Sequence, residues 1–320
     1  GSILRAADLT NAILIGVDLS HMDLTKTKLV GVDLSGKDLS NANLSHANLS
    51  DQDLTNADLT NVRAYGVNLS YANLSGQDLS NIDFSYANLV GADISGADLT
   101  NTKFNTANLK DVDLQNADLT RTSFVQVDLT KIKNKSLAGA NLFGTSFAYS
   151  NLSGVNLSGA ILAGTNVWKA DLSGLDFTVT DVITDGLAFR EANLSNSNFE
   201  GVDLSPQQIY FHVFKNKAHL SNFDHNLIVK NLFGDFTNIL ITQSEVRGND
   251  LAVTYVYFNN FAYANFEDAN FKNTKLWNAK FYLANLTNAD RAGADLGNAN
   301  LSGADLSNAN LEGTNLQGAI

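Results

Sequence analysis

A large apolar residue recurs at every fifth position along most of this 320-residue chain, and this period constrains the fold more than any other feature. From Leu4 to Leu129, Leu, Ile, Val or Phe occupies 25 of 26 such positions, and Ala64 is the exception. From Leu137 to Leu187 all 11 positions match, and from Phe236 to Leu316 16 of 17 match, with Arg291 as the exception. Repetition on this scale predicts a stacked repeat architecture.

The period fits neither a helix nor a flat strand. Five residues advance about 500° around an α-helix, so the apolar centres would spiral over every side. On a flat strand an odd period sends successive centres to opposite faces. The centres all point inward only if the chain bends once per unit, and the Gly or Asn that often follows two residues after the centre suits such a bend. Four bends of about 90° close a square coil of roughly 20 residues, and successive coils pair as parallel strands about 4.8 Å apart.

Individual units carry a family resemblance. Ala57-Asp58-Leu59-Thr60-Asn61 and Ala304-Asp305-Leu306-Ser307-Asn308 resemble the pentapeptide-repeat family, and the resemblance covers nearly the whole chain. It implies an all-β fold, a right-handed quadrilateral parallel β-helix. The square coil follows from the period, whereas the handedness comes from the resemblance. Phe189, Leu194, Phe199 and Leu204 add four units to the 26, 11 and 17 counted above. The resulting 58 units, four to a coil, predict about 14 coils and a rod roughly 70 Å long.

Three breaks interrupt the period. Residues 131–136 add three residues after Leu129, which predicts a small basic loop, and the register slips near 187–190. The largest break covers 205–235 and begins with Ser205-Pro206-Gln207-Gln208. Ser as cap, Pro at the first helical position and Gln three residues after the cap predict a short helix to about Lys217, followed by a loop.

The breaks define the expected organisation. We expect a solenoid over 1–204, an insert with a short helix and a loop over 205–235, and a solenoid over 236–320 that continues the rod. The insert is interpreted either as a bend or plug between the two stretches or as a projecting contact element. Because Leu4 and Leu316 are already in register, we expect either that the solenoid belongs to a longer chain or that rods associate end to end.

Residues 20 apart share one side of the predicted coil, and this alignment yields an unbroken column of six aspartates. Two interpretations are open: aspartate caps the bend of every unit, or the column is an acidic surface for a basic partner. Residues 1–130 hold 16 acidic and 8 basic side chains, which favours a local acidic field. The adjacent side adds Asp33, Asp53, Asp93 and Asp113. The six column residues are Asp18, Asp38, Asp58, Asp78, Asp98 and Asp118.

Aromatic residues at outward positions of the C-terminal stretch form a second candidate surface. Exposed aromatic clusters often mark contacts. They either cover the insert or form a dimer or partner interface, and the spacing predicts that Tyr257 and Trp277 share a face. The candidates are Tyr257, Phe258, Tyr263, Trp277 and Tyr282.

The composition argues against several classes of function. A net charge of −12 and a pI near 4.7 disfavour direct binding of nucleic acid. No apolar run approaches the roughly 18 residues of a membrane-inserted helix. The chain has no Cys, which excludes thiolate chemistry. We therefore predict a protein that is not an enzyme and has no cofactor or metal. The insert holds a cluster of His and Asp residues whose spacing fits no zinc site. The members of this cluster are His212, His219, Asp224 and His225.

The predicted function is a non-catalytic rigid scaffold for protein–protein interaction through flat solenoid faces. The expected partner is another protein; self-association through the solenoid ends or the aromatic surface is a further expectation. One alternative follows from the resemblance, because the family includes members that resemble DNA and bind type II topoisomerases. Duplex DNA carries roughly 40 charges over 70 Å, so a chain of net −12 supports only partial mimicry along one edge. A second alternative is a structural spacer domain of a larger protein.

Overall fold

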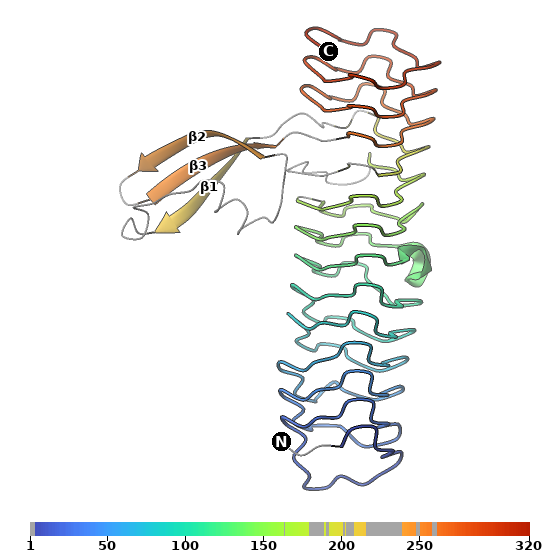
Figure 1. Ribbon diagram of the computed structural model, residues 1–320, viewed down its shortest axis with the longest axis vertical. Coiled ribbons are helices and arrows are strands. Elements are labelled where there is room, and N and C mark those ends of the chain that lie inside the picture. Colours follow the sequence, from blue (N-terminus) through green and yellow to red (C-terminus); the bar gives the residue numbers. More distant parts are fainter. Residues whose placement is uncertain are drawn as a thin grey trace.

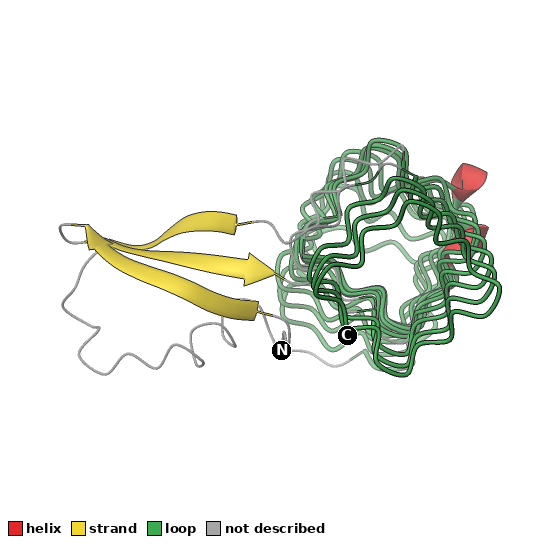
Figure 2. Cartoon of the chain, turned by 90° about the horizontal axis from the view of Figure 1, so that it is seen from above, coloured by secondary structure: helices red, strands yellow, loops and turns green. Residues whose placement is uncertain are grey.

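The repeats wind into a stack of four-sided coils. In the computed structural model, the coils follow one another along the long axis of the molecule (Figure 1), and they lie over one another when seen along that axis (Figure 2). The structure describes residues 4–162, 164–178, 189, 192–200, 202, 208–215, 239–247, 250–257 and 261–320.

Each five-residue unit is one short extended piece followed by one bend. In the unit centred on Leu39, the Ala42 amide donates to the Leu39 carbonyl at 2.9 Å and closes the bend. Asn41 at the corner has a φ of 59°, in the left-handed region. Asn and Gly reach that region at the least steric cost, which explains their preference for this position.

Successive coils pair as parallel strands. The Leu39 amide donates to the Asp58 carbonyl at 2.9 Å, and the Asp58 amide donates back to the Lys37 carbonyl at 2.9 Å. Bridges therefore join residues 20 apart, as in Asp38 with Asp58 and Asp78 with Asp98. This spacing confirms the predicted length of the coil.

The spacing lengthens where the basic loop was expected. Asp118 bridges Asn141, which lies three residues beyond the ordinary partner position at 138. The additional residues lie in two short 3-10 helices, η1 (Leu129–Lys131) and η2 (Lys133–Lys135). The loop therefore leaves one corner while the stack above and below it stays in register.

The stack also continues across the large insert. Asn193 bridges Asn265 and Asn198 bridges Asn270, each pair 72 residues apart. The Leu194 amide donates to the Asn265 carbonyl at 2.7 Å, as between ordinary neighbouring coils. Asp171 bridges Asn193 at a spacing of 22 residues, on either side of the slip near 187–190, of which only residue 189 is described.

The insert extends beyond the expected 205–235 and contains a three-stranded antiparallel sheet, which lies to one side of the stack (Figure 1). Its strands are β1 (Gln208–Lys215), β2 (Ile239–Arg247) and β3 (Asp250–Tyr257), in the order β1-β3-β2. Pairing shifts register between His212 and Phe214 and between Ile241 and Gln243.

Two predictions for this region are wrong. The helix expected after Ser205 is replaced by β1, because a run rich in Ile, Tyr, Phe and Val favours an extended strand paired with β3 over the local capping signal. The coils do not resume at 236, because β2 and β3 occupy that stretch and the described coil residues begin again at Phe261. The loop predicted after Lys217, over 218–235, lies outside the described residues.

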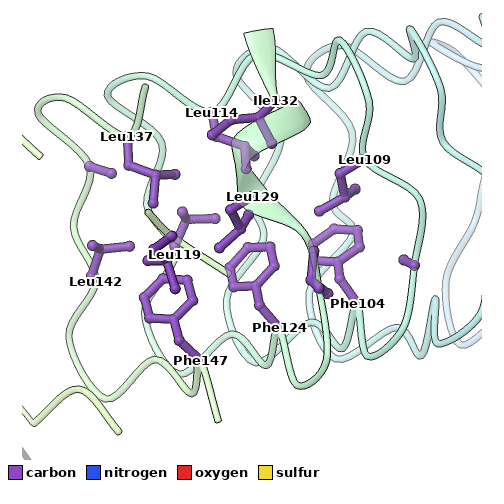
Figure 3. Packing of buried hydrophobic residues seen from close by; sticks show 14 of the residues in the cluster. Phe104, Leu109, Leu114, Leu119, Phe124, Leu129, Ile132, Leu137, Leu142 and Phe147 are labelled. Atoms are coloured by element: carbon purple, nitrogen blue, oxygen red, sulfur yellow. The ribbon is translucent and has the colours of Figure 1, made fainter. Parts of the chain in front are cut away.

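The centres of the units fill the inside of the tube. Leu39 is 0% exposed, and the buried centres form one continuous hydrophobic cluster. Phe104 stacks on Phe124 and Phe124 on Phe147, with ring centroids 5.4 Å apart in both pairs (Figure 3). Each coil thus packs its apolar side chains on those of the next, at about 2 kcal/mol for each large residue removed from water.

Several polar residues at inward positions bond to the backbone of a neighbouring coil. The Thr102 hydroxyl donates to the Leu79 carbonyl at 2.9 Å. Lys37 Nζ donates to the Leu14 carbonyl at 2.8 Å. These contacts satisfy buried donors that would otherwise destabilise the core.

Candidate interaction surface

The structure brings the six predicted aspartates into one column on one side of the stack. All six are exposed, and they repeat about every 4.8 Å, once per coil. The column stops after Asp118, because Asn141 takes its place in the next coil. Its members are Asp18, Asp38, Asp58, Asp78, Asp98 and Asp118.

One oxygen of each column carboxylate holds the bend. Asp58 Oδ1 accepts a hydrogen bond from the Thr60 amide at 2.9 Å, and the same contact recurs through the column at 2.8–3.0 Å. The hydroxyl and amide of Thr60 lower the pKa of Asp58, and those of Ser20 lower the pKa of Asp18. Both carboxyls are therefore ionised at neutral pH.

The second oxygen, Oδ2, accepts no hydrogen bond from any described residue in any of the six. No Lys or Arg nitrogen of the described chain lies within 4.0 Å of them; the ion pairs involve other carboxylates, such as Asp8 with Lys28 at 2.9 Å. The cap therefore uses one oxygen of each carboxylate and leaves the other open, so the two interpretations of the column are compatible.

The adjacent side widens the acidic surface. Asp33, Asp53 and Asp93 are exposed, and at the far end Lys133 of η2 lies 3.0 Å from Asp113 and neutralises it. The hydroxyl and amide of Ser95 lower the pKa of Asp93. We call the column together with these four aspartates the acidic edge.

The structure divides the predicted aromatic surface. Tyr263 and Tyr282 touch edge to face at 5.7 Å, are 48% and 44% exposed, and lie beside the exposed Leu283. Trp277 is 44% exposed and lies over Gly297 on another side. Tyr257 belongs to β3 rather than to a coil, so the prediction that it shares a coil face with Trp277 is wrong. Phe258 lies outside the described residues.

Two aromatic groups escaped the sequence reasoning. Tyr65 packs between His46 and Tyr86, with centroids 5.5 Å and 5.1 Å away. Tyr149 packs on Trp168 at 5.0 Å. These partners are spaced one residue less or one residue more than a full coil, which joins the two flanks of one corner in successive coils. Aromatic residues that lie 19 or 21 positions apart in the sequence are the signal that would have predicted these two groups.

The described residues offer no grouping of three or more His, Asp or Glu side chains suited to a metal ion. No helix in the described part of the chain is long and apolar enough to cross a membrane.

The repeat geometry and the sequence agree with one protein family. A family model described as pentapeptide repeats matches in eight copies, over residues 2–36, 38–70, 68–105, 107–131, 137–178, 185–205, 264–303 and 292–320. The chain belongs to the pentapeptide-repeat family. Its coils are those of the right-handed quadrilateral β-helix, which confirms the predicted fold class. Pentapeptide-repeat proteins are generally structural or interaction proteins.

Solved pentapeptide-repeat structures resemble the chain to different extents. HetL of the cyanobacterium Nostoc sp. strain PCC 7120, involved in heterocyst differentiation regulation, is 25% identical, with 87% of this chain and 88% of HetL covered and a TM-score of 0.30. A trypsin-treated form of QnrB1, a plasmid-mediated fluoroquinolone resistance protein, is 20% identical, with 58% and 91% covered and a TM-score of 0.42. A thylakoid-lumen protein of Arabidopsis thaliana is 30% identical, with 30% and 68% covered and a TM-score of 0.24. No curated protein matches the chain significantly.

Proposed function

We propose that this pentapeptide-repeat chain is a rigid, non-catalytic scaffold for protein–protein interaction, and that the acidic edge is its main contact surface. The observation that carries the proposal is the Asp18–Asp118 column, in which one carboxylate oxygen caps the bend and the other accepts no bond from the described chain. The general role of the family in structure and interaction supports it.

The edge is organised before any partner arrives. The hydrogen bond from each following amide fixes the carboxylate, and the ladder between coils fixes its spacing, so binding orders few side chains. A partner that presents Lys or Arg at a matching spacing gains attraction at every coil. Because these charges are exposed, the attraction weakens as salt is added.

Asparagine substitution tests the charge without disturbing the bend. Asn43 and Asn68 already accept the same amide bond, at 3.1 Å and 3.2 Å, so Asp→Asn keeps the acceptor. The test variant carries D58N, D78N and D98N. The control carries D83N, D128N and D305N, which change the net charge equally, lie off the acidic edge and retain the same cap.

Each form is immobilised and exposed to the same cell extract at low and moderate salt. We expect proteins that bind the wild type and the control to be lost from the test variant and at the higher salt. If all three forms retain the same proteins, the acidic edge is not the contact surface. If none of them retains any protein, the spacer function is favoured instead.

Partial DNA mimicry is the second candidate, and the column is the observation that favours it. Its one charge per about 4.8 Å approaches the 3.4 Å spacing of phosphates along a single DNA strand. On this reading the wild type inhibits supercoiling by DNA gyrase, and the variant with D58N, D78N and D98N does not. Supercoiling that is unchanged by excess wild-type protein excludes this candidate and leaves the scaffold proposal standing.

A further inference from the structure

The C-terminal coils enclose a charged group without a partner. Arg291 occupies a centre position, which is held by Leu or Phe in almost all of the remaining units, and it is 0% exposed. Its Nε and both terminal nitrogens lack a hydrogen-bond partner. Among the described residues it has no ion pair and no aromatic ring within cation–π reach. Burial lowers the pKa of Arg291 to about 10, so the guanidinium remains charged at neutral pH.

The neighbouring carboxylates are held on the outside of the coil. Asp290 Oδ2 lies 3.0 Å from Lys272 Nζ, and its Oδ1 accepts from the Ala292 amide at 3.2 Å. Asp295 Oδ1 accepts from the Gly297 amide at 3.0 Å and from Asn315 Nδ2 at 2.8 Å. Neither carboxylate therefore supplies a counter-charge to the interior.

The backbone does not supply an acceptor either. Lys37, the other long cation at an inward position, donates to the Leu14 carbonyl at 2.8 Å. Arg291 makes no such contact, and its own carbonyl accepts from the Ala294 amide at 2.9 Å and the Thr314 hydroxyl at 2.8 Å. Arg291 is the one charged residue of the described chain with buried unpaired nitrogens.

We propose that Arg291 is the recognition residue of an internal anion site that takes a small monovalent anion of the halide class. The residues at the same position of the neighbouring coils, Phe271 in the preceding coil and Leu311 in the next, are apolar. An apolar surrounding disfavours strongly hydrated divalent anions such as sulfate. A fully enclosed side chain also excludes a carboxylate carried by a large molecule, so the ion is captured as the coils stack.

Crystallography of the full chain, refolded from urea in sodium bromide, tests the site directly. We expect an anomalous bromine peak within about 3.5 Å of the guanidinium nitrogens, the reach of a hydrogen bond to a large anion. R291L restores the usual centre residue and removes the peak. R63L makes the same charge change at an exposed position and keeps it. An ordered Arg291 with no bromine peak beside it overturns the proposal, and so does an Arg291 side chain that points to solvent.

Unfolding in solution gives an independent readout. An ion that binds only the folded chain raises its stability as the ion concentration rises. At constant ionic strength, we expect the wild type and R63L to have a higher urea midpoint in sodium chloride or bromide than in sodium gluconate, whose anion is too large to be enclosed. R291L should unfold at the same midpoint in all three salts. Equal midpoints for the wild type in the three salts contradict an internal halide.

Discussion

At the scale of single residues, the bend needs an acceptor but not a charge. Asn43 and Asn48 each accept the amide two residues ahead at 3.1 Å, much as Asp58 does at 2.9 Å. Asparagine would therefore serve the fold at every position of the acidic column. The uniform choice of aspartate there exceeds what folding requires, and this excess is the residue-level argument for an interaction surface.

The capping carboxylates predict how stability depends on pH. Hydrogen bonds from Thr10 and Lys28 lower the pKa of Asp8 to about 2, and those from Thr25 lower the pKa of Asp23 below its ordinary 3.8. A carboxyl whose pKa is lower when folded stabilises the fold above its unfolded pKa and loses that contribution as pH falls through the folded value. We expect Tm to be level from pH 7 to about 5 and to fall between about 4 and 2. Circular dichroism melts that show no fall by pH 2 would contradict this.

Ala64 predicts a site where the core can be improved. It is the one small centre among the first 26, and it lines a narrow apolar void together with Val62, Leu69 and Phe84. A64L should fill the void and raise the free energy of unfolding by about 1 kcal/mol, measured by urea denaturation. The control A57L enlarges a buried residue at a normally small inward position and should lower it by about 1–3 kcal/mol. Equal destabilisation by both changes would show that the void cannot take a leucine.

At the scale of elements, the coil was predictable and the sheet was not. A strict period of five fixes which residues face inward, so the coil, its corners and the column from Asp18 to Asp118 followed without coordinates. In β2 and β3, apolar residues are frequent enough that Ile241, Val246 and Leu251 matched the period by coincidence. Their partners are set by antiparallel pairing between distant segments, which a local pattern does not reveal.

The bridges across the insert predict that the coils fold without it. Ordinary coil neighbours such as Asn265 and Asn285 are 20 residues apart, whereas Asn193 and Asn265 are 72 residues apart. Deleting residues 206–257 shortens the separation of Asn193 and Asn265 from 72 residues to the ordinary 20. We expect the shortened chain to be a folded rod with cooperative thermal unfolding and a Tm within a few degrees of the full chain. Loss of cooperative unfolding would show that the sheet is needed to join the two stretches of coils.

At the scale of the whole molecule, one column runs past every break. Between its members lie the loop of η1 and η2, the slip near 187–190 and the segment that holds the β1–β3 sheet. Bridges between neighbouring coils resume after each of these breaks. Stability should therefore behave as a sum over neighbouring coils. The column comprises Asp8, Lys28, Asn48, Asn68, Asn88, Asn108, Asp128, Asn151, Asp171, Asn193, Asn265, Asn285 and Asp305.

The candidate sites also differ in whether the repeat register determines them. The acidic edge was predictable because its register is unbroken, whereas Tyr257 was misplaced because its register was a coincidence. The missing partner of Arg291 was not predictable, since it depends on where every neighbouring donor and acceptor points.

Distances between spin labels placed along the column from Asp8 to Asp305 test the central geometric claim most directly. The chain has no Cys, so labels attach only where Asp8→Cys, Asn108→Cys, Asp171→Cys and Asp305→Cys are introduced in pairs. At about 4.8 Å per coil, we predict about 24 Å from 8 to 108, about 38 Å from 8 to 171 and about 58 Å from 8 to 305, before the label linkers are added. The pair 171 and 305 spans the insert and should lie only about 19 Å apart. Separations that do not grow linearly with coil number, or a much longer distance across the insert, would contradict a single continuous four-sided stack.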